Sequence, residues 1–319
     1  MASERAFYGD THPYAHPSEG YESSVETVLL GDVKAFYRTH VRPDNAILLV
    51  AGNLPAEDLR ARLESRLGRW AAEGPLKTQR VKAPPPAGSP RLIVVDKPDA
   101  PQTEIRILVP SPAISSPLVP YLTLQNLIFG GTFTSRLVAN LREKNHFTYR
   151  ASSAFTLRSE PGHLVASSAV HTEKTGAALV EFCKEFRRMK EEEPAAEELE
   201  KAFSTYATRI IEALQTQSGT LQVYAGSAAM GFPPGERREF HGKVLAARDP
   251  GLSRQSLDIF EWDRATFVLV GDRKAIEEQV KELRGRLPGR PEGGMPCELP
   301  EIEVADRDGA VEPADETKK

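Results

Sequence analysis

Arg142 and Tyr149 are the residues whose types and spacing most directly suggest chemistry. They stand seven apart in the stretch LREKNHFTY. A guanidinium and a phenol hydroxyl both donate hydrogen bonds, so the pair could stabilise an oxygen on which negative charge develops. Residues 132–145 are predicted to form a helix and 147–157 a strand, which places the two side chains on either side of a helix-to-strand junction.

The histidines and cysteines do not form a recognisable metal site. His12 and His16 stand four apart in THPYAHP, but Pro13 and Pro17 make a helical pair of ligands implausible. A surface loop is the better prediction for that stretch. The histidines without a partner at ligand spacing, which we expect to be structural or surface groups, are His146, His163, His171 and His241.

Cysteine spacing also argues against a metal site. Cys183 and Cys297 are the two cysteines of the chain, and neither lies in a CxxC or zinc-ribbon pattern. The sequence therefore predicts two unpaired thiols.

Bulk composition excludes two broad functional classes. The chain has 319 residues, 40% of them hydrophobic and 27% charged, with a net charge of −4 and a pI near 6.1. No dense basic stripe suggests nucleic-acid binding. The longest apolar runs, such as residues 46–52, are far shorter than the roughly 20 residues that cross a bilayer. No amino-terminal signal peptide is visible.

The predicted elements favour an α+β fold, because strands and helices come in successive groups. A proline-rich stretch over 71–90 is predicted to be a linker, and 289–319 is predicted to be a disordered acidic tail. The predicted strands are 45–52, 91–96, 102–109, 147–157 and 162–171, and the predicted helices are 23–40, 55–70, 117–129, 132–145, 173–192, 195–216 and 218–230.

An internal repeat organises these elements. AILLVAGN at 46–53 and ATFVLVGD at 265–272 align without a gap, 219 residues apart, and an amphipathic helix follows each. A repeat of this length indicates two copies of one domain. On this interpretation 91–288 is a complete copy, whereas 1–70 is the trailing half of a first copy whose front part is missing.

Four stretches carry a resemblance to a known family. They are YGDTHPYAHPSEG, FYRTHVRPDNAILLVAGN, VVDKPDAPQTEIRI and FGGTFTSRLVANLREKNHFTY. In this order and spacing they resemble the M16 zinc peptidases, which include pitrilysin, insulinase and the mitochondrial processing peptidases. The resemblance implies homologous α+β domains, each an antiparallel sheet packed by helices, arranged as a clamshell around a chamber.

The resemblance also implies where zinc would be. Family members hold it with an inverted His-x-x-Glu-His motif on a helix of the first domain, and no such motif occurs in this sequence. In the second copy Leu122, Gln125 and Asn126 stand at the corresponding positions, and amides are poor zinc ligands beside imidazole. We therefore expect no cofactor on this chain and inactivity in isolation, with Zn²⁺ on a missing amino-terminal part or on a partner chain.

For Arg142 and Tyr149 the resemblance implies a catalytic role. In the family, an Arg and a Tyr at this spacing reach from the non-catalytic half to the zinc site and contact the substrate backbone. Thr148 stands where the family commonly has Gly, a departure that bears on how Tyr149 is placed.

The expected function is that of a non-catalytic portion or subunit of an M16-type metallopeptidase. Its expected partners are a peptide substrate and a zinc-bearing M16 chain or a second copy, with no nucleic acid and no membrane span. A catalytically inert scaffold or peptide-binding relative is the alternative. Both cytoplasmic and periplasmic locations remain open.

Overall fold

The computed structural model describes residues 2–76, 90–233, 235–285 and 297–311. Most of the predicted linker, residues 77–89, therefore lies outside the described residues. The contacts divide the chain into two compact units, and the domain bounds expected from the sequence stay a prediction. The larger unit comprises 1–18, 82–205 and 243–319, and the smaller comprises 19–81 and 206–242.

A six-stranded sheet forms the centre of the larger unit, in the order β3-β4-β2-β5-β1-β6. The α+β prediction is confirmed, but the sheet is mixed, because β1 pairs in parallel with both β5 and β6 while the other pairs are antiparallel. The strands are β1 (Arg91–Asp96), β2 (Gln102–Ser111), β3 (Ala151–Thr156), β4 (Gly162–His171), β5 (Thr266–Gly271) and β6 (Ile302–Ala305).

Alternation along β2 shows how the sheet separates two environments. Ile105 and Ile107 are fully buried, whereas Glu104 and Arg106 between them are partly exposed. This period of two is expected of a strand whose faces differ in polarity. One face of the sheet is therefore apolar, and the other carries charged groups.

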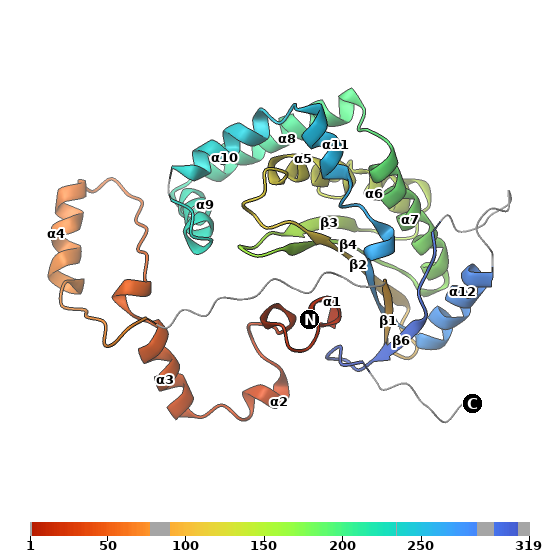
Figure 1. Cartoon of the computed structure of the whole chain (residues 1–319), viewed down its shortest axis with the longest axis horizontal. Helices are drawn as coiled ribbons and strands as arrows, with labels where there is room; N and C mark the ends of the chain where they lie inside the picture. Colours follow the sequence, from red (N-terminus) through yellow and green to blue (C-terminus); the bar gives the residue numbers. More distant parts are fainter. Residues whose placement is uncertain (1, 77–89, 234, 286–296, 312–319) are drawn as a thin grey trace. The chain divides into compact units, whose positions relative to one another are not determined.

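Helices cover the apolar face (Figure 1). Phe129 of α5 packs edge-on against Phe186 of α7 and against Phe260, with ring centroids 5.0 Å apart in each case. Such edge-to-face packing is a favourable geometry for buried rings.

The α-helices of both units are α1 (Ala2–Tyr8), α2 (Glu22–Val25), α3 (Leu30–His40), α4 (Ala56–Leu67), α5 (Val119–Phe129), α6 (Arg136–Val138), α7 (Thr175–Glu191), α8 (Ala196–Leu214), α9 (Gln217–Ala229), α10 (Glu236–Leu245), α11 (Pro250–Leu257) and α12 (Arg273–Gly285).

On the opposite face of the sheet lies α1 (Figure 1). Ala6 joins a small buried cluster with Ile93, Val95 and Val268 of the sheet. Two residues further on, the hydroxyl of Tyr8 lies 2.9 Å from Nδ1 of His163. The amino-terminal residues thus belong to the core of the larger unit, which sequence periodicity did not indicate.

Two predictions about the carboxy-terminal region are wrong. Residues 302–305, assigned to a disordered tail, form β6 and pair with β1. Cys297, predicted to be an unpaired thiol, forms a disulfide with Cys183 of α7, with their Cα atoms 6.2 Å apart. Both links attach the end of the chain to the larger unit. Neither has a local sequence signal, since the paired residues are far apart along the chain.

The smaller unit departs from prediction in two places. In place of the one helix expected over 23–40 there are two, α2 and α3. The second begins at Leu30, where the carboxylate of Asp32 accepts the backbone N–H of Leu29 at 2.9 Å. The buried strand expected over 45–52 does not form, and Ile47, Leu48 and Val50 within it are exposed. A strand requires hydrogen-bonded neighbours, and the described residues supply none here.

No helix among the described residues is long and apolar enough to span a membrane.

Candidate functional site

Arg142 lies on an unusual stretch of helix. Residues Ala139–Lys144 form a π-helix directly after α6, and the N–H of Asn145 donates to the carbonyl of Asn140 at 3.0 Å. Short π-helical turns are rare and often occur at functional sites. The sequence predicted a helix over this region, but its periodicity did not distinguish the π form.

The guanidinium of Arg142 sits partly in solvent, with 34% of the side chain exposed. It lies 4.5 Å from the centre of the Phe133 ring, and its Nε is 3.4 Å from a carboxylate oxygen of Glu143. Exposed pairs of this kind contribute little free energy. A ligand with a stronger acceptor could therefore displace Glu143 at small cost.

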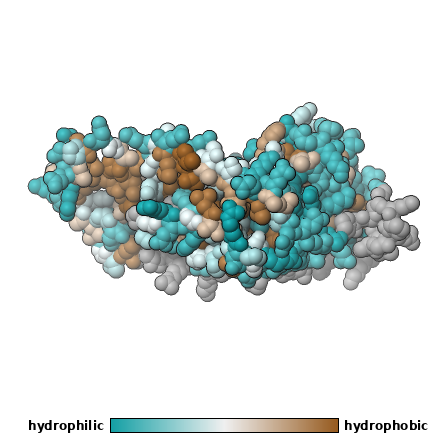
Figure 2. Space-filling model, turned by 90° about the horizontal axis from the view of Figure 1, so that it is seen from above, coloured by the Kyte–Doolittle hydropathy of each residue, from teal (hydrophilic) through white to brown (hydrophobic). Residues whose placement is uncertain are grey.

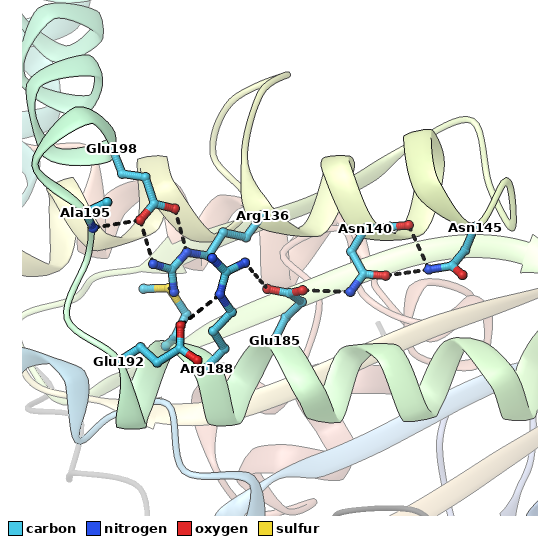
Figure 3. Close-up of polar contacts among 9 residues, drawn as sticks. Arg136, Asn140, Asn145, Glu185, Arg188, Glu192, Ala195 and Glu198 are labelled. Carbon is cyan, nitrogen blue, oxygen red and sulfur yellow. Dashed lines mark hydrogen bonds and ion pairs between the residues drawn. The ribbon is translucent and has the colours of Figure 1, made fainter. Parts of the chain in front are cut away.

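A polar network fixes the helix that carries Arg142 (Figure 3). The buried guanidinium of Arg136 donates to both carboxylate oxygens of Glu198, at 2.7 and 2.6 Å. Asn140 donates to Glu185 of α7 at 2.7 Å and accepts from Asn145 at 2.7 Å. These contacts hold the helix on both sides of its junction with the π-helical turn.

The two carboxylates of this network have different electrostatic environments. Hydrogen bonds from Arg136 lower the pKa of Glu198, whereas burial raises the pKa of Glu185. Arg188 is the nearest cation to Glu185, 3.8 Å from its second oxygen. The network therefore contains a charge-assisted bidentate pair, Arg136 with Glu198, and a second carboxylate, Glu185, whose negative charge is less well compensated.

Tyr149 is presented by a well-anchored loop. The residue is 82% exposed, yet the residues before and after it are tied to the sheet. The hydroxyl of Thr148 donates to the carbonyl of Ala169 at 2.6 Å and accepts the N–H of Arg150 at 3.0 Å, and Ser168 donates to the carbonyl of Arg150 at 3.0 Å. The backbone is thus held on both sides of a phenol that faces solvent.

Thr148 stands where the family commonly has Gly. Its hydroxyl makes the two hydrogen bonds to Ala169 and Arg150, which glycine could not make. The left-handed turn of this loop falls at His146, where φ is 54°. The structure records no contact between Arg142 and Tyr149 among the described residues. Their shared role remains a prediction.

Helix α5, which the family resemblance places where a zinc-binding helix would lie, is buried and apolar. Leu122 and Gln125 of α5 are almost completely inaccessible, and the side-chain amide oxygen Oδ1 of Asn126 accepts a hydrogen bond from the hydroxyl of Ser153 at 2.7 Å. Gly130 allows this close approach, because a Cβ there would lie 2.5 Å from the backbone nitrogen of Ser153. The amide of Asn126 thus helps to hold α5 against β3.

The described residues contain no cluster of three or more His, Cys, Asp or Glu side chains that could hold a metal ion. His12 is a structural group: its Nδ1 accepts the N–H of Tyr14 at 3.0 Å, and its ring stacks on Tyr8 at 4.9 Å. His163 is buried with Tyr8, a pairing that sequence reasoning missed because the two residues are far apart in the chain. The donor set of this part of the chain therefore does not fit a catalytic zinc ion.

Comparison with known proteins gives a consistent result. A family model described as "Peptidase M16 inactive domain" matches residues 28–206. An uncharacterized zinc protease of Mycobacterium tuberculosis is 29% identical over 175 residues, covering 53% of this chain and 38% of the relative. The chain thus spans well under half the length of this curated relative.

Solved structures share the fold. The peptidase M16 inactive domain from Pseudomonas fluorescens matches with a TM-score of 0.74 at 21% identity, over 85% of this chain and 64% of that one. A chain of complex III from Candida albicans matches with a TM-score of 0.68 at 16% identity, over 87% of this chain and 68% of that one. Chains of this fold therefore also occur within multi-subunit assemblies.

Proposed function

Because the chain belongs to the peptidase M16 inactive-domain family, we propose that it is the non-catalytic portion of an M16-type metallopeptidase. It contributes substrate-binding and transition-state contacts to a zinc site that lies outside this sequence, on an amino-terminal part of the protein or on a partner chain. Arg142 and Tyr149 supply those contacts. The observation that carries the proposal is that two hydrogen-bond donors, the partly exposed Arg142 and the exposed Tyr149, extend from backbone that is held in place.

The chemistry follows from the donors themselves. When a nucleophile attacks a peptide carbonyl, the carbonyl oxygen gains negative charge, and preorganised donors stabilise that charge more than they stabilise the ground state. The guanidinium of Arg142 is permanently charged. To bind the substrate oxygen it has to give up its ion pair with the carboxylate of Glu143. Among the described residues the hydroxyl of Tyr149 makes no hydrogen bond, so it supplies a second donor. Zinc held by an amino-terminal part of the protein or by a partner chain would supply the nucleophile.

The exposure of Tyr149 favours this role over a structural one. If the ring only packed on the sheet, it would be buried, but 82% of the residue is accessible. A tyrosine held in this way can bury its ring on a peptide and still donate through its hydroxyl.

The test combines the purified chain with a zinc-bearing M16 chain and measures hydrolysis of a fluorogenic peptide. We expect Arg142→Ala to lower kcat by about 100-fold, as loss of an oxyanion-stabilising donor does, with zinc content unchanged. Arg187→Ala is a matched control, since Arg187 forms an exposed i,i+4 ion pair with Glu191. Tyr149→Phe should also lower kcat, whereas Tyr224→Phe should not.

Two results would count against the proposal. If Arg142→Ala is as active as the unsubstituted chain, Arg142 does not act as a transition-state donor. Peptide binding without any hydrolysis in the combined sample would favour the inert-scaffold alternative.

A further inference from the structure

Phe133 is an exposed aromatic residue in the loop between α5 and α6. Its exposed fraction is 66%, and the surface of the larger unit is mainly hydrophilic on the side shown in Figure 2. A single exposed ring is common on protein surfaces and needs no explanation by itself. Phe133 differs in having a charged neighbour, because the guanidinium carbon of Arg142 lies 4.5 Å from the centre of its ring.

The loop that carries the ring is anchored on both sides. Phe133 occupies the first corner of a turn that is closed by a hydrogen bond of 3.2 Å from the N–H of Ser135 to the carbonyl of Thr132. The hydroxyl of Thr132 donates to the carbonyl of Leu127 in α5 at 3.1 Å. Ser135 is buried and directly precedes α6. The turn is therefore attached to α5 at its start and to α6 at its end.

The contacts of the helix do not by themselves fix the guanidinium of Arg142. The polar network of Figure 3 holds the backbone of the π-helical turn through Asn140, but its hydrogen bonds do not extend to the end of the Arg142 side chain. That side chain is long and has many rotamers in solution, whereas a donor for developing charge is most effective when it is already oriented. Among the described residues, the ring of Phe133 and the carboxylate of Glu143 are the interaction partners of the guanidinium.

These two partners differ in their effect on a substrate oxygen. The carboxylate of Glu143 attracts the same N–H groups that the oxygen needs, so it competes with the substrate. The ring of Phe133 attracts the cation through its electron-rich face and takes up none of these N–H groups. The ring can therefore hold the guanidinium in place and leave its donors available.

We propose that Phe133 is a positioning residue for Arg142, whose guanidinium it holds in the orientation that meets the carbonyl oxygen of the peptide once the pair with Glu143 has opened. The inference rests on the proposed function, because it requires Arg142 to act as a transition-state donor. Phe133 itself touches neither the substrate nor the reacting atoms. Its effect therefore falls on kcat and depends on the presence of the guanidinium.

The first experiment tests the geometry in the full chain alone. Nuclear magnetic resonance detects the Nε–H proton of Arg142 in the isotope-labelled chain, and its loss in Arg142→Lys assigns the signal. Because the ring current of an aromatic side chain shifts protons above its face upfield, the signal should lie upfield of those of other exposed arginines. It should move downfield to join them in Phe133→Leu and stay upfield in Phe133→Tyr. A signal that does not move in Phe133→Leu would overturn the inference.

The second experiment measures peptide hydrolysis by the full chain combined with a zinc-bearing M16 chain. Phe133→Leu keeps an apolar side chain but removes the ring, so it should lower kcat by about threefold to tenfold, the size of a cation–π interaction, with KM unchanged. Phe133→Tyr restores the ring and should restore kcat. Thr134→Ala is the matched control, because Thr134 is an exposed residue at the other corner of the same turn, and it should retain full activity.

A double-mutant cycle separates positioning from direct contact with the substrate. In the Arg142→Ala background, Phe133→Leu should lower kcat no further, since no guanidinium is left to hold. If the two substitutions instead lower kcat independently, or if Phe133→Leu raises KM, the ring contacts the peptide and the inference is wrong.

The same assay distinguishes failure of this inference from failure of the proposed function. If Arg142→Ala loses activity while Phe133→Leu is fully active, Phe133 does not position Arg142, and the proposed function stands. Full activity of Arg142→Ala would refute the proposed function and this inference with it.

Discussion

Acidification should destabilise the larger unit through a single buried imidazole, that of His163. The residue is 2% exposed, and burial lowers its pKa to about 4. Glu4 opposes this shift, while Arg158 and Arg106 add to it. The imidazole nitrogen Nδ1 lies 2.9 Å from the hydroxyl of Tyr8, whose own pKa burial raises to about 12.

The magnitude follows from the difference between folded and unfolded states. In the unfolded chain the imidazole has its ordinary pKa of about 6.5, so between pH 6.5 and pH 4 the unfolded state binds more protons. Stability from this group is therefore complete above pH 6.5 and is lost as the pH falls toward 4. One pH unit corresponds to about 1.4 kcal/mol, which gives a loss of about 3 kcal/mol between pH 7 and pH 4.

Urea unfolding at pH 7 and pH 4 measures this loss. Carboxylates also titrate in the same range, so the comparison needs a variant that differs only at the imidazole. His163→Gln retains a polar side chain beside Tyr8 but cannot be protonated. The decrease in unfolding free energy between the two pH values should be about 3 kcal/mol smaller in the variant. If the unsubstituted chain and the variant lose the same amount, the imidazole is not buried in neutral form as the structure has it.

Two further predictions concern the core of the larger unit. Phe186→Ala should lower the unfolding free energy by about 3–5 kcal/mol, because the ring is fully buried among Phe129, Phe260 and Trp262; a decrease below about 1 kcal/mol would contradict this packing. Reduction of the disulfide between Cys183 and Cys297 should lower the urea midpoint, with a cost of about 2–4 kcal/mol, whereas an unchanged midpoint would show that the link does not constrain the unfolded chain.

Much of the larger unit could be predicted because its elements have strong local patterns. The expected strands at 91–96 and 162–171 have the observed bounds. The long helices expected at 173–192 and 195–216 correspond to α7 and α8 within two residues at each end. In each case apolar residues recur with the period of the element, and the chain supplies the neighbours that bury them.

Features that depend on distant partners could not be predicted. Cys183 and Cys297 carry no signal of their pairing, and β6 is a segment of four residues that becomes a strand by pairing with β1. At 45–52 the sequence has a clear strand pattern, but no strand forms, because the described residues offer no strand with which it could pair. For the candidate site, the sequence indicated Arg142 and Tyr149 but gave no sign of the π-helical turn or of the anchoring by Thr148.

The place of β5 in the sheet has a consequence for biosynthesis. This strand separates β1 from β2, although both are made long before it. Until residue 271 has left the ribosome, the early strands have a gap that no neighbour fills, and their apolar side chains are open to wrong partners. Sheets with such non-local order form slowly and are prone to aggregate on the way. Ribosome-bound chains that end before β5 should therefore depend on chaperones more than the finished chain does.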